Sequence, residues 1–263
     1  MIADMTETYA RELFDAERSR QPISPITERD STFYIDDAYA VQLINIERAT
    51  ALGYRVSGKK IGLTSPAMQR QLGVGEPDYG HLFTAMECPG GIVNTDALIQ
   101  PKIEAELAFC LKKDLRGGSI TPADVDDATE YIAAAFEIVD SRVADWRIKL
   151  QDTVADNASS GRYVLGQIKI PPKTIDLSCV AMMLYKNEDK GEALMGDGLG
   201  SAVMGDPRIA VAWLANKLWD YGVALNAGEV ILSGAFSAAP PAKKGDTFRA
   251  VFTDFGTVEA RFV

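Results

Sequence analysis

The sequence predicts an α+β fold in which a helical N-terminal part packs on a β-rich remainder. Two helical apolar patterns open the chain, and short apolar runs typical of strands outnumber helical patterns after residue 100. No internal repeat or low-complexity linker divides the 263 residues. A chain of this length can bury a substantial core in one large domain or two small ones.

The first hundred residues contain both helical and strand-like segments. The predicted elements are, in order, helices over 3–19 and 35–52, a strand over 55–64 and a loop over 72–91. Asp36 or Asp37 can cap the second helix. The loop is predicted from its Gly and Pro content, and Gly58 interrupts the strand.

The remainder alternates strands with two helices. The predicted elements are strands near 101–112 and 134–141, a helix near 121–131, a polar turn at 156–160, a strand at 163–165, a hairpin beginning with 179–185, a helix over 207–221, and strands over 230–233, 247–253 and 257–263. Pro122 fits the first helical turn, and residues 186–189 are expected to join the hairpin. Residues 196–201 are glycine-rich but lack the lysine of a P-loop, so they are expected to be a turn.

Charge and hydropathy exclude several classes of partner. The net charge of −10 predicts a surface that repels nucleic acid and anionic membranes. The first residues have neither a basic nor an apolar signal-peptide region, and no apolar stretch approaches the length of a membrane span. We therefore expect a cytoplasmic protein with neither a nucleic-acid nor a membrane partner.

The cysteine and histidine content limits the chemistry. Three widely spaced cysteines argue against a disulfide framework or a zinc knuckle. His81 is the single histidine, so a metal site with several histidines is excluded. Acid–base work then falls to Lys, Asp, Glu, Tyr or bound water.

Three carboxylates lie in apolar, strand-like runs. Glu104 and Glu106 are two positions apart, so on a strand they point to one face roughly 7 Å apart. Glu137 lies in the middle of a separate apolar run, where an isolated buried charge is costly. Carboxylates without histidine or thiol favour a hard cation, Mg²⁺ or Mn²⁺. The alternative, in which all three carboxylates lie on solvated strand faces, is equally compatible with the spacing.

Further polar groups accompany these carboxylates. Lys59 and Lys60 lie in a strand-like run between glycines, where Lys60 could stabilise an enolate or donate a proton, and both could equally be solvated lysines on an edge strand. Asp78 could be a base or a turn aspartate. Residues 152–160 are dense in short hydrogen-bonding side chains, which make caps and turns or hold a carboxylate ligand or a catalytic water.

Several long motifs occur together in the chain. They are Lys60-Ile-Gly-Leu-Thr-Ser, Gln71-Leu-Gly-Val with Pro77-Asp-Tyr-Gly, Gln100-Pro-Lys-Ile-Glu-Ala-Glu-Leu-Ala-Phe, Phe136-Glu-Ile-Val-Asp-Ser-Arg with Asp145-Trp146, Asp152-Thr-Val-Ala-Asp-Asn-Ala-Ser, Gly228-Glu-Val-Ile-Leu-Ser-Gly and Gly256-Thr-Val-Glu-Ala-Arg-Phe. In these motifs the chain resembles the 2-keto-4-pentenoate (2-hydroxypenta-2,4-dienoate) hydratases of the fumarylacetoacetate hydrolase superfamily, from about residue 35 to the C-terminus.

The resemblance implies a fold, a cofactor and an assembly. It implies a mixed β-roll core of the fumarylacetoacetate hydrolase type with a helical N-terminal part, a divalent cation (Mg²⁺ or Mn²⁺) and a homo-oligomer, a decamer of dimers being known among relatives. We expect one catalytic unit over 1–263, in which an N-terminal α/β segment of about 1–75 packs on a β-rich catalytic core of about 76–263. A complex with an upstream or downstream pathway enzyme fits such an assembly.

Carried over residue by residue, the resemblance also implies a site. It makes Glu104, Glu106 and Glu137 the metal ligands. It makes Lys60 and Asp78 the catalytic pair, with acid and base roles that can be exchanged. It places Ser159, Asp156 and Leu63 around the substrate.

The implied activity is a metal-dependent hydration. The enzyme would add water to 2-hydroxypenta-2,4-dienoate (2-oxopent-4-enoate) and give 4-hydroxy-2-oxopentanoate, in the meta-cleavage degradation of aromatic compounds. The alternatives are a 4-oxalocrotonate decarboxylase or a non-catalytic partner of such a decarboxylase. Arg162 stands where we expect an apolar residue in several hydratases, so it either binds a second substrate carboxylate or lies at the surface.

Overall fold

Two curled β-sheets form the body of the protein in a computed structural model that describes every residue except 1, 67–68, 71–73 and 189–190. The strands are β1 (Val56–Gly62), β2 (Asp78–Phe83), β3 (Ile92–Val93), β4 (Lys102–Leu111), β5 (Thr129–Val139), β6 (Ser160–Leu165), β7 (Ala181–Glu188), β8 (Gly191–Leu199), β9 (Val230–Leu232), β10 (Thr247–Phe252) and β11 (Gly256–Phe262). One sheet has the order β2-β1-β9-β4-β5-β6 and the other β3-β11-β10-β7-β8. The pairs β1–β9 and β3–β11 are parallel, and the other pairs are antiparallel.

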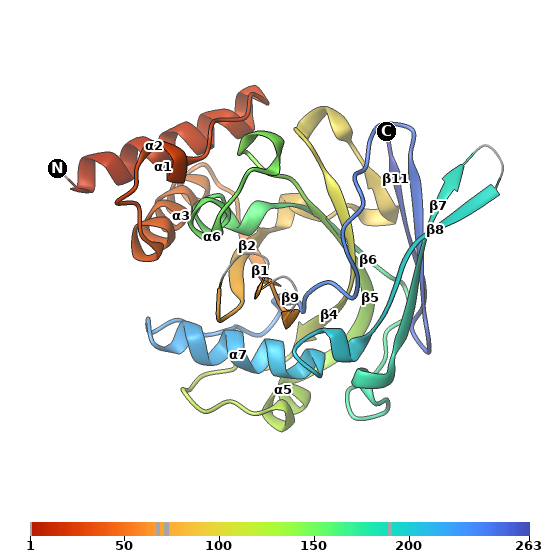
Figure 1. Cartoon of the computed structure of the whole chain (residues 1–263). Coiled ribbons are helices and arrows are strands. Elements are labelled where there is room, and N and C mark those ends of the chain that lie inside the picture. Colours follow the sequence, from red (N-terminus) through yellow and green to blue (C-terminus); the bar gives the residue numbers. More distant parts are fainter. Residues whose placement is uncertain (1, 67–68, 71–73, 189–190) are drawn as a thin grey trace.

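Helices cover two parts of this body (Figure 1). They are α1 (Ile2–Ser19), α2 (Ile26–Arg29), α3 (Ile35–Ala51), α5 (Pro122–Ala128), α6 (Leu150–Ala155) and α7 (Pro207–Trp219). The helices α1, α2, α3 and α6 gather at the upper left of Figure 1 and share a core that includes Tyr9, Leu13, Ile26, Val41 and Val154. The other two, α5 and α7, lie side by side below the sheets.

The main core is formed by the inner faces of the two sheets. Phe109 and Phe136 enter it from the first sheet, and Phe248, Phe252 and Phe262 enter it from the second. In β10 every second residue is buried, which is the pattern of a strand with one face to the core. By contrast, β4 and β5 are buried almost throughout, so polar side chains on them have little access to solvent.

The expected fold class is confirmed, since helices and strands form an α+β fold with curled mixed sheets. The predicted helices over 3–19, 35–52 and 207–221 correspond to α1, α3 and α7, with ends that differ by at most two residues. The predicted strands over 55–64 and 101–112 correspond to β1 and β4. These elements have long or strongly periodic patterns, which local sequence specifies well.

The predicted loop over 72–91 is wrong for residues 78–83, while residues 72–73 lie outside the described part of the chain. It contains β2, which is fully buried and pairs with β1. Gly80 suggested a turn, but the strand needs a glycine there: a Cβ would lie 2.3 Å from the backbone oxygen of Asn157. Close packing against a distant segment, invisible in the local sequence, decided this element.

Three further expectations differ from the structure. Residues 196–199, expected to be a turn, belong to β8, because cross-strand pairing with β7 overrides the weak strand preference of glycine. Likewise, β7 continues through the expected turn as far as Glu188, and Asp189 lies outside the described residues. The helix expected over 121–131 ends at Ala128, where β5 begins pairing with β4. The short helices α2 and α6 were not predicted because neither is long enough to show a helical period.

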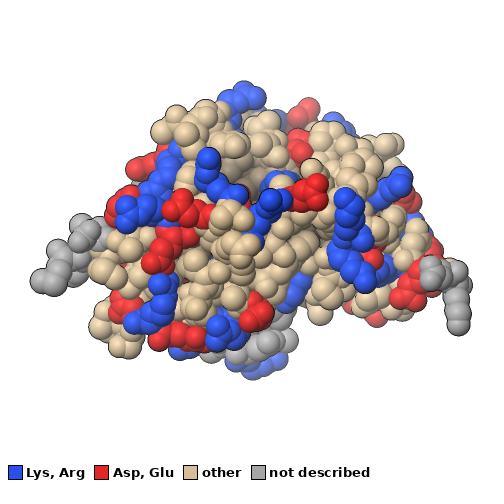
Figure 2. All heavy atoms as spheres, turned by 90° about the horizontal axis from the view of Figure 1, so that it is seen from above, with Lys and Arg blue, Asp and Glu red and all other residues tan. Residues whose placement is uncertain are grey.

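The face seen from above carries both signs of charge (Figure 2). Among the described side chains on that face, Lys and Arg residues are interspersed with Asp and Glu residues. This mixture, with a net charge of −10, is unlike the continuous basic surface of a nucleic-acid-binding protein. None of the described helices has both the length and the apolar character to span a membrane.

The two neighbouring lysines of β1 lie on opposite strand faces, and neither is solvated. Because β1 lies between β2 and β9, the expectation of solvated lysines on an edge strand is wrong. Lys59 is 3% exposed, and its Nζ donates to both carboxylate oxygens of Glu229 at 2.9 and 2.8 Å. Glu229 also accepts from the backbone N–H of Asn226 at 3.2 Å, so this pair ties β1 to the turn before β9.

We expect Lys59→Met to destabilise the fold by about 3–5 kcal/mol, because it leaves the buried Glu229 carboxylate without its cation. Urea unfolding followed by circular dichroism measures this change. The double variant Lys59→Met with Glu229→Leu is expected to recover most of the loss, because both charges are then absent. Equal stability of Lys59→Met and the wild type would contradict a buried ion pair.

Candidate metal centre and substrate pocket

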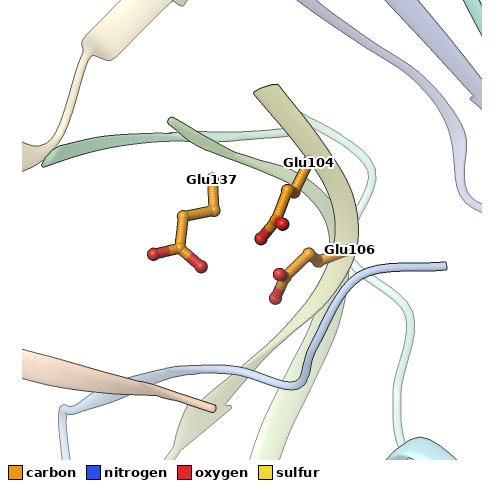
Figure 3. A group of neighbouring side chains, drawn as sticks. All are labelled: Glu104, Glu106 and Glu137. Carbon is orange, nitrogen blue, oxygen red and sulfur yellow. The ribbon is translucent and has the colours of Figure 1, made fainter. Parts of the chain in front are cut away.

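Three glutamates from two adjacent strands converge on one point (Figure 3). Glu104 on β4 is the direct cross-strand partner of Glu137 on β5, and Glu106 lies two residues further along β4 on the same face. One carboxylate oxygen from each residue lies within 4.8 Å of the other two. The antiparallel register thus adds the third carboxylate to the pair that the sequence spacing indicated.

The carboxylates have fewer partners than buried charges require. Glu106 and Glu137 are fully buried. The backbone N–H of Gly234 donates to Glu106 Oε2 at 2.8 Å, while Glu106 Oε1 and Glu137 Oε2 have no hydrogen-bond partner among the described residues. Buried charges normally are paired or coordinate a metal. Unpartnered carboxylate oxygens without histidine or thiol fit a hard divalent cation such as Mg²⁺ or Mn²⁺.

The pKa values of all three glutamates are raised in the absence of a cation. Burial, opposed by Lys60 and assisted by Glu104, raises the pKa of Glu137 to about 7. Burial and the two neighbouring glutamates raise the pKa of Glu106 well above its ordinary value. Burial also raises the pKa of Glu104. Without a cation, part of the cluster therefore holds protons near neutral pH.

Lys60 lies beside the cluster as a counter-charge. Its Nζ is 3.1 Å from Glu137 Oε1, and the side chain is 4% exposed. Burial alone lowers the pKa of Lys60, but Glu137, Asp78, Glu104 and Glu106 together outweigh burial and raise it above its ordinary value. Lys60 is therefore an ammonium ion at neutral pH.

Asp78 reaches the same site from β2. It pairs with Gly62 in the β1–β2 register, and Lys60 lies two residues before Gly62 on the same strand face. A Cβ at residue 62 would lie 2.2 Å from Asp78 Oδ1, so only glycine leaves room for this carboxylate. Burial raises the pKa of Asp78, and the charge of Lys60 opposes that rise.

A cavity of about 660 Å³ opens over these groups. The predicted site residues that line it are Lys60, Leu63, Asp78, Glu104 and Ser159. Thr153 lines it too, and its Oγ1 lies 3.4 Å from the Oγ of Ser159. The volume suits a small organic acid, since ligand cavities commonly measure about 300–1,000 Å³.

Two residues of interest face elsewhere. Asp156 is 2% exposed, and its carboxylate accepts from Nε and the backbone N–H of Arg142 rather than lining the 660 Å³ cavity. Arg162 donates to the carbonyl of Gly161 at 2.8 Å and lines a second cavity of about 440 Å³, which also borders Asp156. Among the described residues, the structure thus brings neither side chain to the wall of the 660 Å³ cavity, which Glu104 lines.

Sequence reasoning missed several residues of the pocket. They include Gly62, Lys102, Trp146 and Thr153, which line the cavity. Gly234, whose backbone N–H donates to Glu106, was also missed. Lys102 Nζ lies 4.1 Å from the centre of the Trp146 ring, a cation–π contact at the pocket wall. The signal for Lys102 was its place two residues before Glu104 on one strand face. No comparable signal marks Gly234, whose N–H reaches Glu106 only through the tertiary fold.

Comparison with known proteins gives a consistent picture. Residues 79–263 match the model of the family described as fumarylacetoacetate (FAA) hydrolase C-terminal. The chain is 46% identical over 259 residues to 2-hydroxyhexa-2,4-dienoate hydratase of Comamonas testosteroni, covering 97% of each chain. It is 45% identical over 263 residues to 2-keto-4-pentenoate hydratase of Paraburkholderia xenovorans (strain LB400), covering 100% of this chain and 96% of that protein.

Solved structures agree with these sequence relatives. The structure of 4-oxalocrotonate decarboxylase from Pseudomonas putida G7, complexed with magnesium and adipate, matches with a TM-score of 0.94 at 35% identity, over 99% of this chain and 98% of that chain. The same enzyme complexed with calcium and acetate matches with a TM-score of 0.92 at 34% identity, over 99% and 98% of the two chains.

The raised pKa values predict how metal binding depends on pH. Glu137 has a pKa of about 7 in the folded, metal-free protein and about 4.5 when unfolded, so its protonation stabilises the fold below about pH 4.5, and this contribution is lost as the pH rises to about 7. Since Mg²⁺ must displace these protons, we expect the Mg²⁺-induced rise in Tm to be larger at pH 8 than at pH 5.5. Differential scanning fluorimetry at several pH values measures it.

Matched variants separate this effect from general ionic stabilisation. Glu137→Gln and Glu106→Gln are expected to remove most of the Mg²⁺-induced rise in Tm. Glu192→Gln, at an exposed ion pair with Arg249, is expected to retain it. A wild-type response in either of the first two variants would exclude that residue as a ligand.

Proposed function

The chain belongs to the fumarylacetoacetate hydrolase family, and we propose that it is the hydratase that adds water to 2-hydroxypenta-2,4-dienoate and yields 4-hydroxy-2-oxopentanoate in the meta-cleavage degradation of aromatic compounds. The observation that carries this proposal is the buried cluster of Glu104, Glu106 and Glu137 beside Lys60, in a chain 46% identical to a hydratase of a 2-hydroxydienoate. The enzyme is accordingly a hydro-lyase.

The three glutamates would hold the cation, which we propose to be Mg²⁺ or Mn²⁺. When bound, such a cation supplies Lewis acidity that stabilises negative charge on the substrate's C2 oxygen. The chain's own groups supply the rest. The Lys60 ammonium is held in place by Glu137, so it can stabilise developing negative charge or deliver a proton to C5. Ser159 and Leu63 line the cavity where the substrate would lie.

Asp78 is the second proton-transfer group of this proposal. Its Oδ1 is buried without a hydrogen-bond partner among the described residues, and its raised pKa makes it a better base than an ordinary aspartate. It would orient or deprotonate the water that adds to C4. Lys60 and Asp78 lie on one face of adjacent strands, and because Lys60 is an ammonium ion, we assign it the acid role and Asp78 the base role.

The decarboxylase alternative needs a partner for a second substrate carboxylate. Arg162 was the candidate, and it lines the 440 Å³ cavity instead of the 660 Å³ cavity that Glu104 lines. The sequence identity to the hydratases, 45–46%, also exceeds the 35% identity to the decarboxylase of Pseudomonas putida G7. Both comparisons favour the hydratase.

The family resemblance supports further proposals about the whole protein. We propose that the protein is a cytoplasmic homo-oligomer. We propose a decamer of dimers as its assembly and, separately, a complex with an upstream or downstream pathway enzyme. We also propose that an N-terminal segment of about 1–75 packs on a catalytic core of about 76–263. The family match over 79–263 begins close to this boundary and supports the division.

Incubation with Mg²⁺ and each of two candidate substrates tests the activity. We expect 2-hydroxypenta-2,4-dienoate to gain the mass of one water, with 4-hydroxy-2-oxopentanoate identified by mass spectrometry and NMR. We expect 2-hydroxymuconate not to lose CO₂. Arg162→Leu is expected to leave this preference unchanged. CO₂ release from 2-hydroxymuconate, without hydration of the dienoate, would instead establish the decarboxylase.

Lys60→Met tests the proposed ammonium. A charge beside the developing enolate acts mainly in the transition state, so the variant should lower kcat more than it raises KM. Loss of one charge-assisted interaction of about 1.5–3 kcal/mol corresponds to roughly a tenfold to hundredfold fall in kcat. Steady-state kinetics at saturating Mg²⁺ measure the changes in kcat and KM separately. Lys217→Met, at an exposed ion pair with Glu76, serves as the control. A wild-type kcat in Lys60→Met would remove this lysine from the mechanism.

A further inference from the structure

The turn that carries Ser159 has an unusual backbone. Asn157, Ala158 and Ser159 have φ values of 54°, 50° and 54°, so three consecutive residues other than glycine are left-handed. Residues with a Cβ rarely adopt this conformation, and a run of three persists only where the surroundings enforce it. The contacts around the turn therefore indicate what holds Ser159 in place.

The first of these contacts is a buried ion pair between Asp156 and Arg142. The Arg142 side chain is 7% exposed and that of Asp156 is 1% exposed. Arg142 Nε donates to Asp156 Oδ1, and the backbone N–H of Arg142 donates to Asp156 Oδ2 at 3.0 Å. The Asp156 carboxylate thus fixes both the backbone and the side chain of Arg142.

Arg142 in turn holds the backbone on both sides of the turn. Its Nη2 donates to the carbonyl of Asp156 at 2.5 Å, immediately before the turn. Its Nη1 donates to the carbonyl of Ser160 at 2.8 Å, immediately after the turn, and to that of Asp140 at 2.6 Å, just beyond the end of β5. One guanidinium therefore joins the two ends of the turn to the end of the strand that carries Glu137.

The second contact joins the turn to β2. Asn157 Oδ1 accepts from the backbone N–H of His81 at 2.7 Å, and Asn157 Nδ2 donates to the carbonyl of His81 at 2.9 Å. The backbone of the turn packs closely on Gly80. Because Asp78 lies on this same strand, the position of Ser159 is fixed relative to Asp78.

The Ser159 side chain is less firmly held than this backbone. Its Oγ lies 3.4 Å from Thr153 Oγ1 and 3.4 Å from Asp156 Oδ2, which are long distances for hydroxyl hydrogen bonds. Ser159 lines the 660 Å³ cavity, whereas Asp156 and Arg142 line the 440 Å³ cavity on the other side of the turn. The hydroxyl can therefore turn towards a ligand while the ion pair stays behind it.

We propose that Asp156, Arg142 and Asn157 are positioning residues, which force the left-handed turn and thereby present the Ser159 hydroxyl to the 2-oxo acid group of the substrate. Asp156 acts through Ser159 and does not itself contact the substrate. This inference rests on the proposed hydratase function, which supplies the substrate class. It revises the expectation that Asp156 is a substrate-binding residue.

A double-mutant cycle on ligand binding tests the proposal. Isothermal titration calorimetry measures the Kd of 2-oxopentanoate, a saturated analogue without a C=C bond to which water could add, on the Mg²⁺-loaded protein. We expect Ser159→Ala and Asp156→Asn each to raise Kd about tenfold, as expected for one lost hydrogen bond. We expect the double variant to bind 2-oxopentanoate only about tenfold more weakly than the wild type, because both changes remove the same contact. An approximately hundredfold rise in the double variant would show independent effects and overturn the proposal.

A matched aspartate distinguishes positioning from general loss of structure. Asp152 is also buried and lies on α6, four residues before Asp156, but its carboxylate accepts from Thr27 and from the backbone N–H of Lys149, away from the turn. In the double variant Asp152→Asn with Ser159→Ala, the fold-change in Kd should equal the product of the two single fold-changes, because the two residues act independently. A cycle as non-additive for Asp152 as for Asp156 would mean that the whole segment, and not the ion pair, positions Ser159.

A milder variant covers the case in which Asp156→Asn does not fold. Asn157→Asp keeps the acceptor for the His81 N–H and removes the donor to the His81 carbonyl, and its cycle with Ser159→Ala should also be non-additive. Multiplying effects there would overturn the proposal. A further outcome is that the wild type binds 2-oxopentanoate and the Ser159–Asp156 cycle is non-additive, while the wild type forms no hydration product. In that case the proposed function fails and the positioning role stands. Absence of 2-oxopentanoate binding to the wild type would overturn the positioning proposal, whereas the hydration assay with 2-hydroxypenta-2,4-dienoate decides the proposed function.

Discussion

Concentration of negative charge in a buried site is the constraint on which the rest of this structure depends. The β4–β5 register places Glu104 opposite Glu137, and both strands are buried almost throughout. Three carboxylates and Asp78 face one ammonium, Lys60. Burial is the main cause of the raised pKa values of the glutamates, and the neighbouring carboxylates, which one ammonium cannot compensate, add to it. Binding of a divalent cation would supply the missing positive charge.

Two adjacent lysines illustrate how one strand serves both stability and chemistry. Lys60 and Lys59 are equally buried, but alternation along β1 sends them to opposite faces. Lys59 is paired with the carboxylate of Glu229, whose two oxygens accept hydrogen bonds from its Nζ. Lys60 faces several carboxylates, and its Nζ lies 3.1 Å from Glu137 Oε1. The same residue type is therefore structural on one face and available to a ligand on the other.

The helical end of the molecule supports the site from behind. Gln42 of α3 is fully buried, and its Nε2 donates to the carbonyls of Tyr79 at 3.1 Å and Val154 at 2.8 Å. Tyr79 follows Asp78 on β2, and Val154 lies on α6, just before the left-handed turn. One side chain of the N-terminal part thus connects the strand of the proposed base to the segment that presents Ser159. This connection supports the proposal that the N-terminal helices and the pocket form one catalytic unit.

Much of the architecture follows from local sequence. Helical periodicity identified α1, α3 and α7, and apolar runs identified β1, β4 and the C-terminal strands. The spacing of Glu104 and Glu106 was enough to place two carboxylates on one strand face. Resemblance to a family, rather than spacing, added Glu137, Lys60 and Asp78 to one site. Local patterns succeed here because they depend only on the geometry of a single helix or strand.

Tertiary structure decided what depends on contacts between distant segments. It made residues 78–83 a strand, because β1 supplies the pairing and the Asn157 turn requires Gly80. It turned Asp156 away from the pocket and onto Arg142, and it placed Arg162 at a different cavity. Short polar side chains such as Asp156 can cap, pair or bind, and the local sequence does not distinguish these possibilities. Only the buried partner that each one meets selects among them.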